Sequence, residues 1–334
     1  MTKGASKENR EHGKESLQGA LPKGIDVNEF VHAISTSGYP LQITVGTALR
    51  QREFFLQEEF AFEDPDQGGR RTVDILGHRW SERFESEQGT SLFSVTPLIE
   101  CKQSQHPLVL FEAVSSPSLG KFPRLVGYPR QEIGVGTENE PNTKRIVPIL
   151  EFLGSGNHEF ISQPPVAASM SRAVPNGKKV QLSGEETYRA ITMPLIKASS
   201  AVRTYWAASR RDAKELWTLR MVVPVAVVDC PLIFVRQPAT EPEIEPRSWI
   251  RLAVREVMSG KQDVWKPVGV EIVDIVQREF LERYLDDYLL TFASIIRQRA
   301  CEIHDIFLSG SAMIPGLDWD NPPTKPLYQL ALAD

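Results

Sequence analysis

The chain has 334 residues, of which 41% are hydrophobic and 24% charged, and its formal net charge is −5. This composition is typical of an ordinary soluble globular protein, and the length suits one large domain or two ordinary ones. The negative charge does not favour nucleic-acid binding. It does not exclude it either, because an enzyme that acts on DNA needs only a local basic groove.

The three cysteines, Cys101, Cys230 and Cys301, lie far apart and follow no disulfide or metal-binding spacing. We interpret them as free thiols in a reducing compartment. The longest apolar stretch, residues 221–235, is interrupted by proline and aspartate and is too short to span a bilayer. The N-terminal segment lacks the apolar core of a signal peptide. These features predict a cytoplasmic protein that does not enter a membrane.

The periodic patterns divide the chain into a folded region and two tails. The expected parts are a polar disordered tail over 1–24, one domain over 25–310 and a proline-rich C-terminal tail over 311–334. The core of the domain is expected over 40–112 and 184–300. Between these segments, residues 115–183 form an insertion that is rich in Pro, Gly, Asn and Ser, and its secondary structure cannot be placed from the sequence.

The first half of the core predicts helices followed by strands. Asp26 is a plausible N-cap for a helix that ends at Gly38, and a second short helix is expected over about 41–50. The expected strands that follow are at 54–62, 71–78, 92–102 and 106–112. The turn-rich segment 64–69 makes a β-hairpin of the first two, and 81–91 reads as a polar connection.

The second half of the core predicts a helix followed by buried strands. Ser183 and Glu186 have the spacing of a capping box, and apolar residues recur at helical spacing from Tyr188 to Tyr205. The elements expected next are a valine-rich buried strand at 218–228, a partner strand at 232–235, an ordered segment at 249–257 and a long helix at about 276–299.

Two of the expected strands carry acidic residues where a buried strand normally carries none. Asp74 lies in the second strand and Glu100 in the third. Burying an unpaired carboxylate costs several kcal/mol or forces it to become neutral. Lys102 is two residues from Glu100, so both side chains project from one face of the strand while Cys101 points to the other. A metal ion, a cationic partner or an open cleft would explain these charges.

The same residues suit a magnesium site. Mg²⁺ prefers hard oxygen ligands and keeps several of its waters. Asp74 and Glu100 would supply carboxylate oxygens, and the backbone carbonyl of Cys101 would supply a third ligand. Lys102 would then orient or help deprotonate an attacking water, or neutralise charge on a phosphoryl group. The sequence leaves open whether one or two metal ions take part.

The order helix, strand, strand with Asp74, strand with Glu100-Cys101-Lys102, helix, strand resembles the PD-(D/E)xK superfamily of restriction-endonuclease-like nucleases. The strings Arg-Thr-Val-Asp and Leu-Ile-Glu-Cys-Lys-Gln look like its Mrr-type branch. The resemblance implies an α/β fold with a central mixed sheet flanked by helices. It also implies DNA as substrate, Mg²⁺ as cofactor with Mn²⁺ able to substitute, and Asp74, Glu100 and Lys102 as catalytic or metal-binding residues. Gln103 falls where that branch often has a further polar site residue.

Some positions depart from the family pattern. Val73 precedes Asp74 where the motif name has proline, and the extra acidic residue of the first helix is not obvious, with Glu29 and Glu58 as candidates. Glu100 and Lys102 could instead form a solvent-facing pair on a half-exposed strand. The alternative function is a catalytically inactive module of the same fold that binds nucleic acid or a protein partner, including a second copy of the chain.

Basic and aromatic residues elsewhere suggest contacts with phosphate but have simpler explanations. The basic run 210–214, flanked by Trp206 and Trp217, and the pair Lys178-Lys179 could face a nucleic acid, although charged loops are usually only solvated. His78 and His106 lie near strand ends, where a histidine is more often a surface or capping residue. The sequence does not show a choice between DNA and RNA, or any base specificity.

Overall fold

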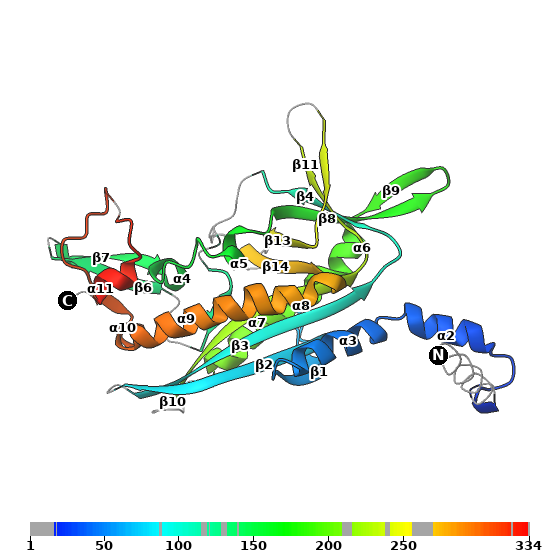
Figure 1. Ribbon diagram of the computed structural model, residues 1–334, viewed down its shortest axis with the longest axis horizontal. Helices are drawn as coiled ribbons and strands as arrows, with labels where there is room; N and C mark the ends of the chain where they lie inside the picture. The colour runs from blue at the N-terminus through cyan, green and yellow to red at the C-terminus, as the bar shows by residue number, and fades with distance from the viewer. Residues whose placement is uncertain are drawn as a thin grey trace, which may run out of the picture.

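The computed structural model describes residues 17, 19–86, 89–114, 119, 121–127, 132–138, 140–208, 216–237, 241–255, 270–321 and 323–332. These residues form a large mixed β-sheet flanked by helices, with a small three-stranded sheet toward one end (Figure 1). The predicted mixed α/β class, with a central mixed sheet flanked by helices, is therefore confirmed. Most of the expected N-terminal tail lies outside the described residues.

The strands differ widely in length, from three residues in β5 to 17 in β2. They are β1 Phe55–Glu63, β2 Arg70–Ser86, β3 Gly89–Gln103, β4 Leu108–Glu112, β5 Arg124–Val126, β6 Glu132–Thr137, β7 Glu140–Pro148, β8 Val166–Asn176, β9 Lys179–Ser183, β10 Leu216–Asp229, β11 Leu232–Arg236, β12 Glu243–Pro246, β13 Trp249–Arg255, β14 Val270–Gln277 and β15 Ser311–Met313.

The helices include two π-helical segments, η1 and η4, and one 3₁₀ segment, η3. They are α2 Val27–Thr36, α3 Tyr39–Arg50, α4 Ile149–Phe152, α5 Glu159–Ser162, α6 Glu185–Thr187, η1 Tyr188–Thr192, α7 Met193–Ala208, η3 Arg278–Phe280, α8 Leu281–Arg283, η4 Tyr284–Leu290, α9 Thr291–Glu302, α10 His304–Ser309 and α11 Leu327–Ala331. No helix of the described residues is long and apolar enough to cross a membrane.

The main sheet runs in the order β1-β2-β3-β10-β14-β13-β8-β4-β11-β12, while β5 pairs with β10 and β9 with β8. Strands β1, β2 and β3 form an antiparallel meander. The chain then returns through α7 to β10, which is parallel to β3 over its whole length. The second sheet has the order β15-β6-β7.

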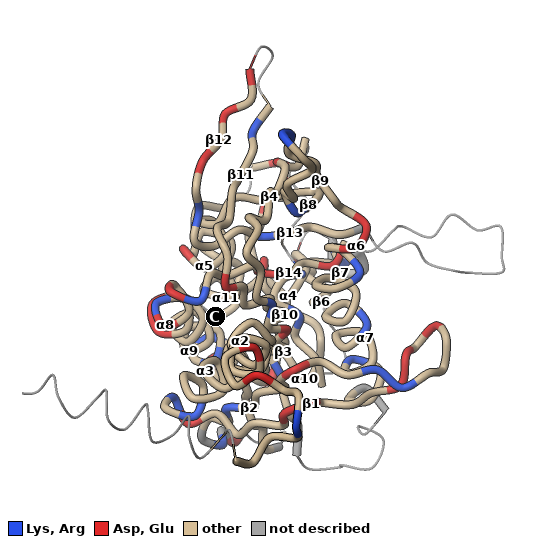
Figure 2. The backbone as a smooth tube through the Cα atoms, turned by 90° about the vertical axis from the view of Figure 1, so that its right-hand side faces the viewer, with Lys and Arg blue, Asp and Glu red and all other residues tan. Residues whose placement is uncertain are grey.

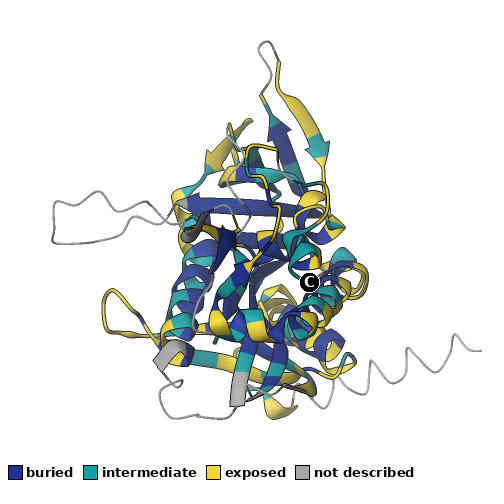
Figure 3. Cartoon of the chain, turned by 90° about the vertical axis from the view of Figure 1, so that its left-hand side faces the viewer, coloured by how far each residue is buried: buried dark blue, intermediate teal, exposed yellow. Residues whose placement is uncertain are grey.

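Residues that alternate along β10 face two separate apolar clusters, so helices cover both faces of the sheet (Figure 3). Val225 and Val227 belong to the cluster that contains Val45 of α3 and residues of η4 and α9. Val228 belongs to the cluster of Leu195 and other residues of α7. We call these the α3 face and the α7 face of the sheet.

A buried ion pair connects the middle of the sheet to the helices. The guanidinium of Arg251 on β13 binds both carboxylate oxygens of Asp274 on β14, at 2.8 and 3.2 Å, and neither side chain is exposed. Arg251 also donates to the carbonyls of Phe160 and Ile161, and the Tyr284 hydroxyl donates to Asp274 at 2.9 Å. Each charge is thus satisfied inside the core.

Several expectations about local structure were wrong. The polar segment 81–91 mainly extends β2 and β3 beyond a bulge near Trp80, because long twisted ribbons tolerate polar residues on exposed faces. The strand at 232–235 pairs with β4 and β12 instead of β10. Ser183 does not cap the following helix; its carbonyl accepts a hydrogen bond from Thr187.

The insertion and the C-terminal tail contain more structure than expected. The described part of 115–183 contributes β5 to β9, α4 and α5. The residues expected as a tail contribute β15 and α11, and Leu317 and Tyr328 are buried against the α3-face cluster. The long helix begins only at Leu281, after β14, because the buried apolar run of that strand precedes it.

Candidate functional site

Asp74 and Glu100 lie on neighbouring strands at the same level of the sheet. Strands β2 and β3 are in register at Leu76–Leu98 and Ile75–Ile99, which puts Asp74 and Glu100 one step further on. Lys102 and Gln103 follow at the end of β3, beside the end of β10. The structure therefore brings together the Asp, Glu and Lys that the sequence singled out.

Where β2 and β3 separate, the Asp74 side chain provides a hydrogen-bond acceptor in place of the backbone carbonyl that a regular ladder would use. Its Oδ2 accepts a hydrogen bond of 2.6 Å from the backbone N–H of Cys101. On its other side, β1 pairs Glu58 with Ile75 and Phe60 with Val73, leaving Glu59 opposite Asp74 without a ladder partner. Glu59 has φ of 50°, a left-handed conformation that is uncommon for a residue other than glycine. The ladder is thus irregular on both strands at Asp74.

Glu100 is almost fully buried, and only one of its oxygens is satisfied. The side chain is 6% exposed, and Oε1 accepts from Lys102 Nζ at 2.6 Å. The Oε2 atom is buried and has no hydrogen-bond partner within the described structure. Cys101 belongs to the α3-face cluster, so strand alternation places Glu100 and Lys102 on the α7 face, as predicted.

The electrostatics of the site show a shortage of positive charge. Burial, and secondly the charge of Asp74, raise the pKa of Glu100 to about 7 against the opposing effect of Lys102. Burial also raises the pKa of Asp74, although the Cys101 N–H opposes this change. Burial alone would lower the pKa of Lys102, but the adjacent Glu100 carboxylate together with the charge of Asp74 opposes this effect, and the net change raises the pKa. One ammonium therefore balances two partly buried carboxylates.

The start of α3 lies against the same point of the sheet. A Cβ on Gly38, at the N-terminus of α3, would lie 3.7 Å from the carbonyl oxygen of Cys101. One turn later, Gln42 Nε2 donates to the Asp74 carbonyl at 3.1 Å and to Glu59 Oε1 at 3.3 Å. Gln42 and Glu59 were not predicted as site residues, because the contact depends on how α3 packs on the hairpin.

The remaining predicted site residues have no described contact with the carboxylates of Asp74 and Glu100. Gln103 is exposed beside Asp229 of β10. Glu58 forms an ion pair with Arg50 of α3. Glu29 is exposed on α2, where its backbone N–H binds the Asp26 cap, and no interaction described for it reaches Asp74 or Glu100. Neither candidate for the extra acidic residue is brought to the site.

The oxygen atoms present fit a hard divalent cation. Asp74 and Glu100 offer carboxylates, the Glu100 Oε2 atom lacks a partner, and the Cys101 carbonyl lies on the same strand. The described residues contain no group of three or more His, Cys, Asp or Glu side chains placed to hold a metal ion. The donor set is therefore two carboxylates and a backbone carbonyl, which suits Mg²⁺ because this ion retains several waters.

The histidines and basic residues noted in the sequence lie elsewhere. His78 contacts Thr96 and stacks on Trp80, and the backbone N–H of His106 binds Ser104 in a turn. Lys178 and Lys179 are exposed at the β8–β9 hairpin. The basic run 210–214 and the Trp217 side chain lie outside the described residues.

Comparison with known proteins adds no assignment. The chain matches no protein-family model, no curated protein and no solved structure.

Proposed function

We propose that the protein is a metal-dependent nuclease that hydrolyses phosphodiester bonds in DNA. The observation that carries this proposal is the convergence of Asp74, Glu100 and Lys102 where β2 and β3 separate. The order α3, β1, β2, β3 and then, after the intervening segment from β4 to η1, α7 and β10 supports a restriction-endonuclease-like core, because it is the element order that suggested the PD-(D/E)xK resemblance. Strands β3 and β10 are parallel.

Mg²⁺, or Mn²⁺ in its place, would be held by Asp74, Glu100 and the carbonyl of Cys101. A bound divalent ion supplies Lewis-acid polarisation of a phosphoryl oxygen and lowers the pKa of a coordinated water. The Cys101 N–H fixes the orientation of the Asp74 carboxylate, and Gln42 holds the Asp74 backbone from the opposite side. These two contacts pre-orient one ligand before a cation arrives.

Lys102 has the position and charge to act on the substrate. Its ammonium is attached to Glu100 in the described structure and is about a third exposed, so it can reach both the carboxylate and solvent. A substrate phosphate would attract this ammonium, which would orient the attacking water or neutralise the phosphoryl oxygens. Gln103 is exposed at the strand end and would donate a hydrogen bond to a neighbouring phosphate.

A catalytically inactive module with the same fold is the alternative. It is favoured by the Glu100–Lys102 contact, which partly neutralises the site without a metal ion. It is also favoured by exposed apolar side chains on α2, where Val31 and Ile34 are 43% and 49% exposed, since such residues suit a protein partner or a second copy.

The test is a cleavage assay on plasmid, single-stranded DNA and RNA with Mg²⁺ or Mn²⁺. We expect cleavage that needs the metal and that is abolished by Asp74→Ala and by Lys102→Ala. The matched control is Glu58→Gln, which removes a carboxylate from the same hairpin but away from the site. Cleavage that survives either alanine substitution contradicts the assignment. Binding of nucleic acid without any cleavage supports the inactive module.

A further inference from the structure

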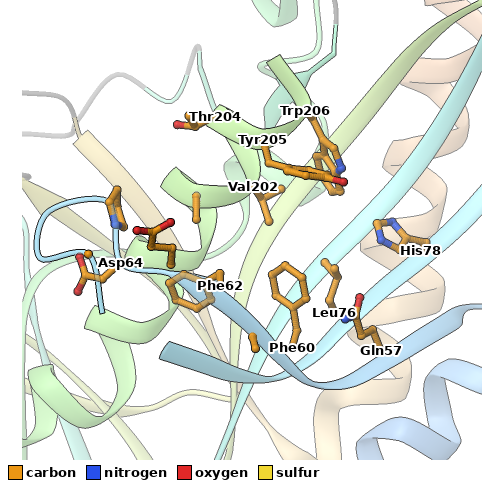
Figure 4. Close-up of a pocket in the computed structure, with 15 residues that line it drawn as sticks. Gln57, Phe60, Phe62, Asp64, Leu76, His78, Val202, Thr204, Tyr205 and Trp206 are labelled. Carbon is orange, nitrogen blue, oxygen red and sulfur yellow. The ribbon is translucent and has the colours of Figure 1, made fainter. Parts of the chain in front are cut away.

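A large cleft lies between α7 and the β1–β2 hairpin. Its volume is about 970 Å³, within the range of sites that hold small molecules. Figure 4 shows Tyr205 and Trp206 of α7 on one side, and Phe60, Leu76 and His78 of the hairpin on the other. The proposed catalytic residues do not line this cleft, and the function proposed above gives it no role.

Aromatic rings line the cleft, and some of them are accessible. Tyr205 is 71% exposed although it is a large ring on a helix. Phe60 is half-buried beside Phe62, with ring centroids 6.2 Å apart. Trp206 and His78 pack against each other at 5.5 Å at one end of the cleft. Flat apolar surfaces of this kind are suited to stacking against the face of a planar ring.

A cation without an acidic partner lies at that same end. The Arg220 guanidinium is centred 4.6 Å from the Trp206 ring and 5.5 Å from the Trp80 ring. Its Nε is buried without a hydrogen-bond partner, and no described carboxylate forms an ion pair with it. Burial, and secondly the charge of Arg220, lower the pKa of His78 to about 4, so the histidine is neutral at pH 7. Arg220 is not among the residues that line the cleft, but it contacts Trp206 of the wall and supplies positive charge at this end.

Of the acidic groups near the opposite end of the cleft, Asp64 and Asp66 are engaged in ion pairs, whereas Glu63 lines the cleft and is exposed. Asp64 is buried and pairs with Arg71, and Asp66 pairs with Lys197. Acidic and basic residues are otherwise interspersed along the described backbone (Figure 2). An anionic group would thus be favoured at the Arg220 end, and a neutral ring along the aromatic walls.

The cleft is close to the candidate catalytic residues. Leu76 in its wall pairs with Leu98, which is two residues from Glu100 on the same strand. Strand spacing puts Leu76 roughly 8 Å from Glu100. A stacked nucleic-acid strand advances about 3.4 Å per nucleotide, so two or three nucleotides cover this distance.

We propose that this cleft binds an unpaired nucleotide of the substrate strand, with its base stacked on Tyr205 and Phe60 and its phosphate facing Arg220. The inference rests on the proposed nuclease function, because the nucleotide belongs to the strand whose phosphodiester lies at Asp74, Glu100 and Lys102. The substrate class is accordingly single-stranded nucleic acid, or a duplex with a frayed or unpaired end. A fully paired blunt duplex cannot place a base in the cleft.

The test measures binding of a labelled single-stranded oligonucleotide in EDTA, so that cleavage does not affect the readout. Tyr205→Ala is expected to weaken binding 5- to 100-fold, the range for loss of one stacked base. Tyr205→Phe keeps the ring and should bind like the wild type. Ile244→Ala, which truncates a 64% exposed apolar residue on β12, controls for general surface effects.

Arg220→Gln tests the charge, with Arg220→Lys as the variant that retains it. Loss of one phosphate contact should reduce the slope of log affinity against log salt by about 0.7 for a single strand, a change that misfolding alone would not give. An oligonucleotide that lacks bases should bind Tyr205→Ala and wild-type protein equally. These results support the cleft as a nucleotide site.

Other outcomes overturn the inference. If Tyr205→Ala and Arg220→Gln bind the single strand as tightly as wild type, the cleft does not hold a nucleotide. The same conclusion follows if Tyr205→Ala abolishes only self-association or capture of an apolar peptide. In either case the Asp74 and Lys102 variants still decide the nuclease function by themselves. Conversely, weakened binding by Tyr205→Ala in a protein that never cleaves supports the cleft while refuting hydrolysis.

Discussion

The Asp74 carboxylate accepts a hydrogen bond of 2.6 Å from the Cys101 backbone N–H. A side chain thereby continues a strand ladder at the point where the two backbones separate. The bond orients Asp74 toward Cys101, which lies between Glu100 and Lys102 in the sequence. Two acidic residues are held close together, and only one lysine balances them.

Removing the charge of Asp74 should weaken the binding of a divalent cation. We expect Asp74→Asn to lower Mn²⁺ affinity at least 10-fold in calorimetric titration, because an amide oxygen carries no charge to replace the carboxylate. Glu58→Gln should bind Mn²⁺ like the wild type, since Glu58 is paired with Arg50. Equal affinities in Asp74→Asn and wild type would remove Asp74 from the metal site.

The metal-free protein should lose stability as the pH rises. The folded pKa of Glu100, about 7, is above its ordinary value of 4.5, so the folded state holds this proton more tightly than the unfolded chain. The contribution of the Glu100 proton to the unfolding free energy is fully present below pH 4.5. This contribution, roughly 3 kcal/mol, is lost as the pH rises through 7.

Glu100→Gln does not titrate, so its unfolding free energy in EDTA should exceed that of the wild type increasingly from pH 5 to pH 8. Denaturant titrations of both proteins across this range measure the difference. Asp74 titrates in both proteins and largely cancels in this comparison. A difference that stays constant with pH contradicts the assignment of the buried charge to Glu100.

Glu59 and Glu53 share a left-handed backbone but differ in position. Their φ angles are 50° and 63°. The conformation costs roughly 1–2 kcal/mol, part of which glycine recovers, so Glu59→Gly and Glu53→Gly should each raise the unfolding free energy by about 1 kcal/mol. Only Glu59→Gly should also change Mn²⁺ affinity, because Gln42 Nε2 donates hydrogen bonds both to the Glu59 carboxylate and to the Asp74 carbonyl oxygen. Equal effects of both substitutions on metal binding would place Glu59 outside the site.

The buried Arg251–Asp274 pair should stabilise the fold strongly but should have no part in the proposed hydrolysis. Arg251→Met removes the ion-pair partner of Asp274 in the core, and we expect a loss of about 3–5 kcal/mol in urea denaturation. Arg247→Met removes an exposed pair with Glu245 and should cost under about 1 kcal/mol. A similar loss of unfolding free energy in both variants would show that the buried Arg251–Asp274 pair stabilises the fold no more than an exposed ion pair does.

The parts of the site that follow from local rules could be predicted from the sequence. The spacing of Glu100 and Lys102 predicts that they share a face, and their ion pair confirms it. The hairpin signals at 64–69 predict that β1 pairs with the strand that carries Asp74, and the antiparallel β1–β2 ladder confirms it. These predictions need only strand periodicity and turn chemistry, which act over a few residues.

Contacts that depend on packing could not be predicted. Gln42 and Asp74 are 32 residues apart in the sequence, and their hydrogen bond depends on how α3 packs on the hairpin. The strand β14 is not predicted from the sequence, and only its last two residues fall within the helix expected at about 276–299. Its buried Asp274 interrupts the apolar run, and the partner Arg251 is distant in sequence. The apolar residues of the C-terminal region are too widely spaced to show a period, although Leu317 and Tyr328 are buried.

The most direct test of the central claim is a crystal structure with Mn²⁺, located by its anomalous scattering. We expect an ion bound by the carboxylates of Asp74 and Glu100 and by the carbonyl oxygen of Cys101, with Lys102 displaced from the coordinating Glu100 oxygen. The absence of an ion there at saturating Mn²⁺, with the Glu100–Lys102 contact unchanged, would contradict it.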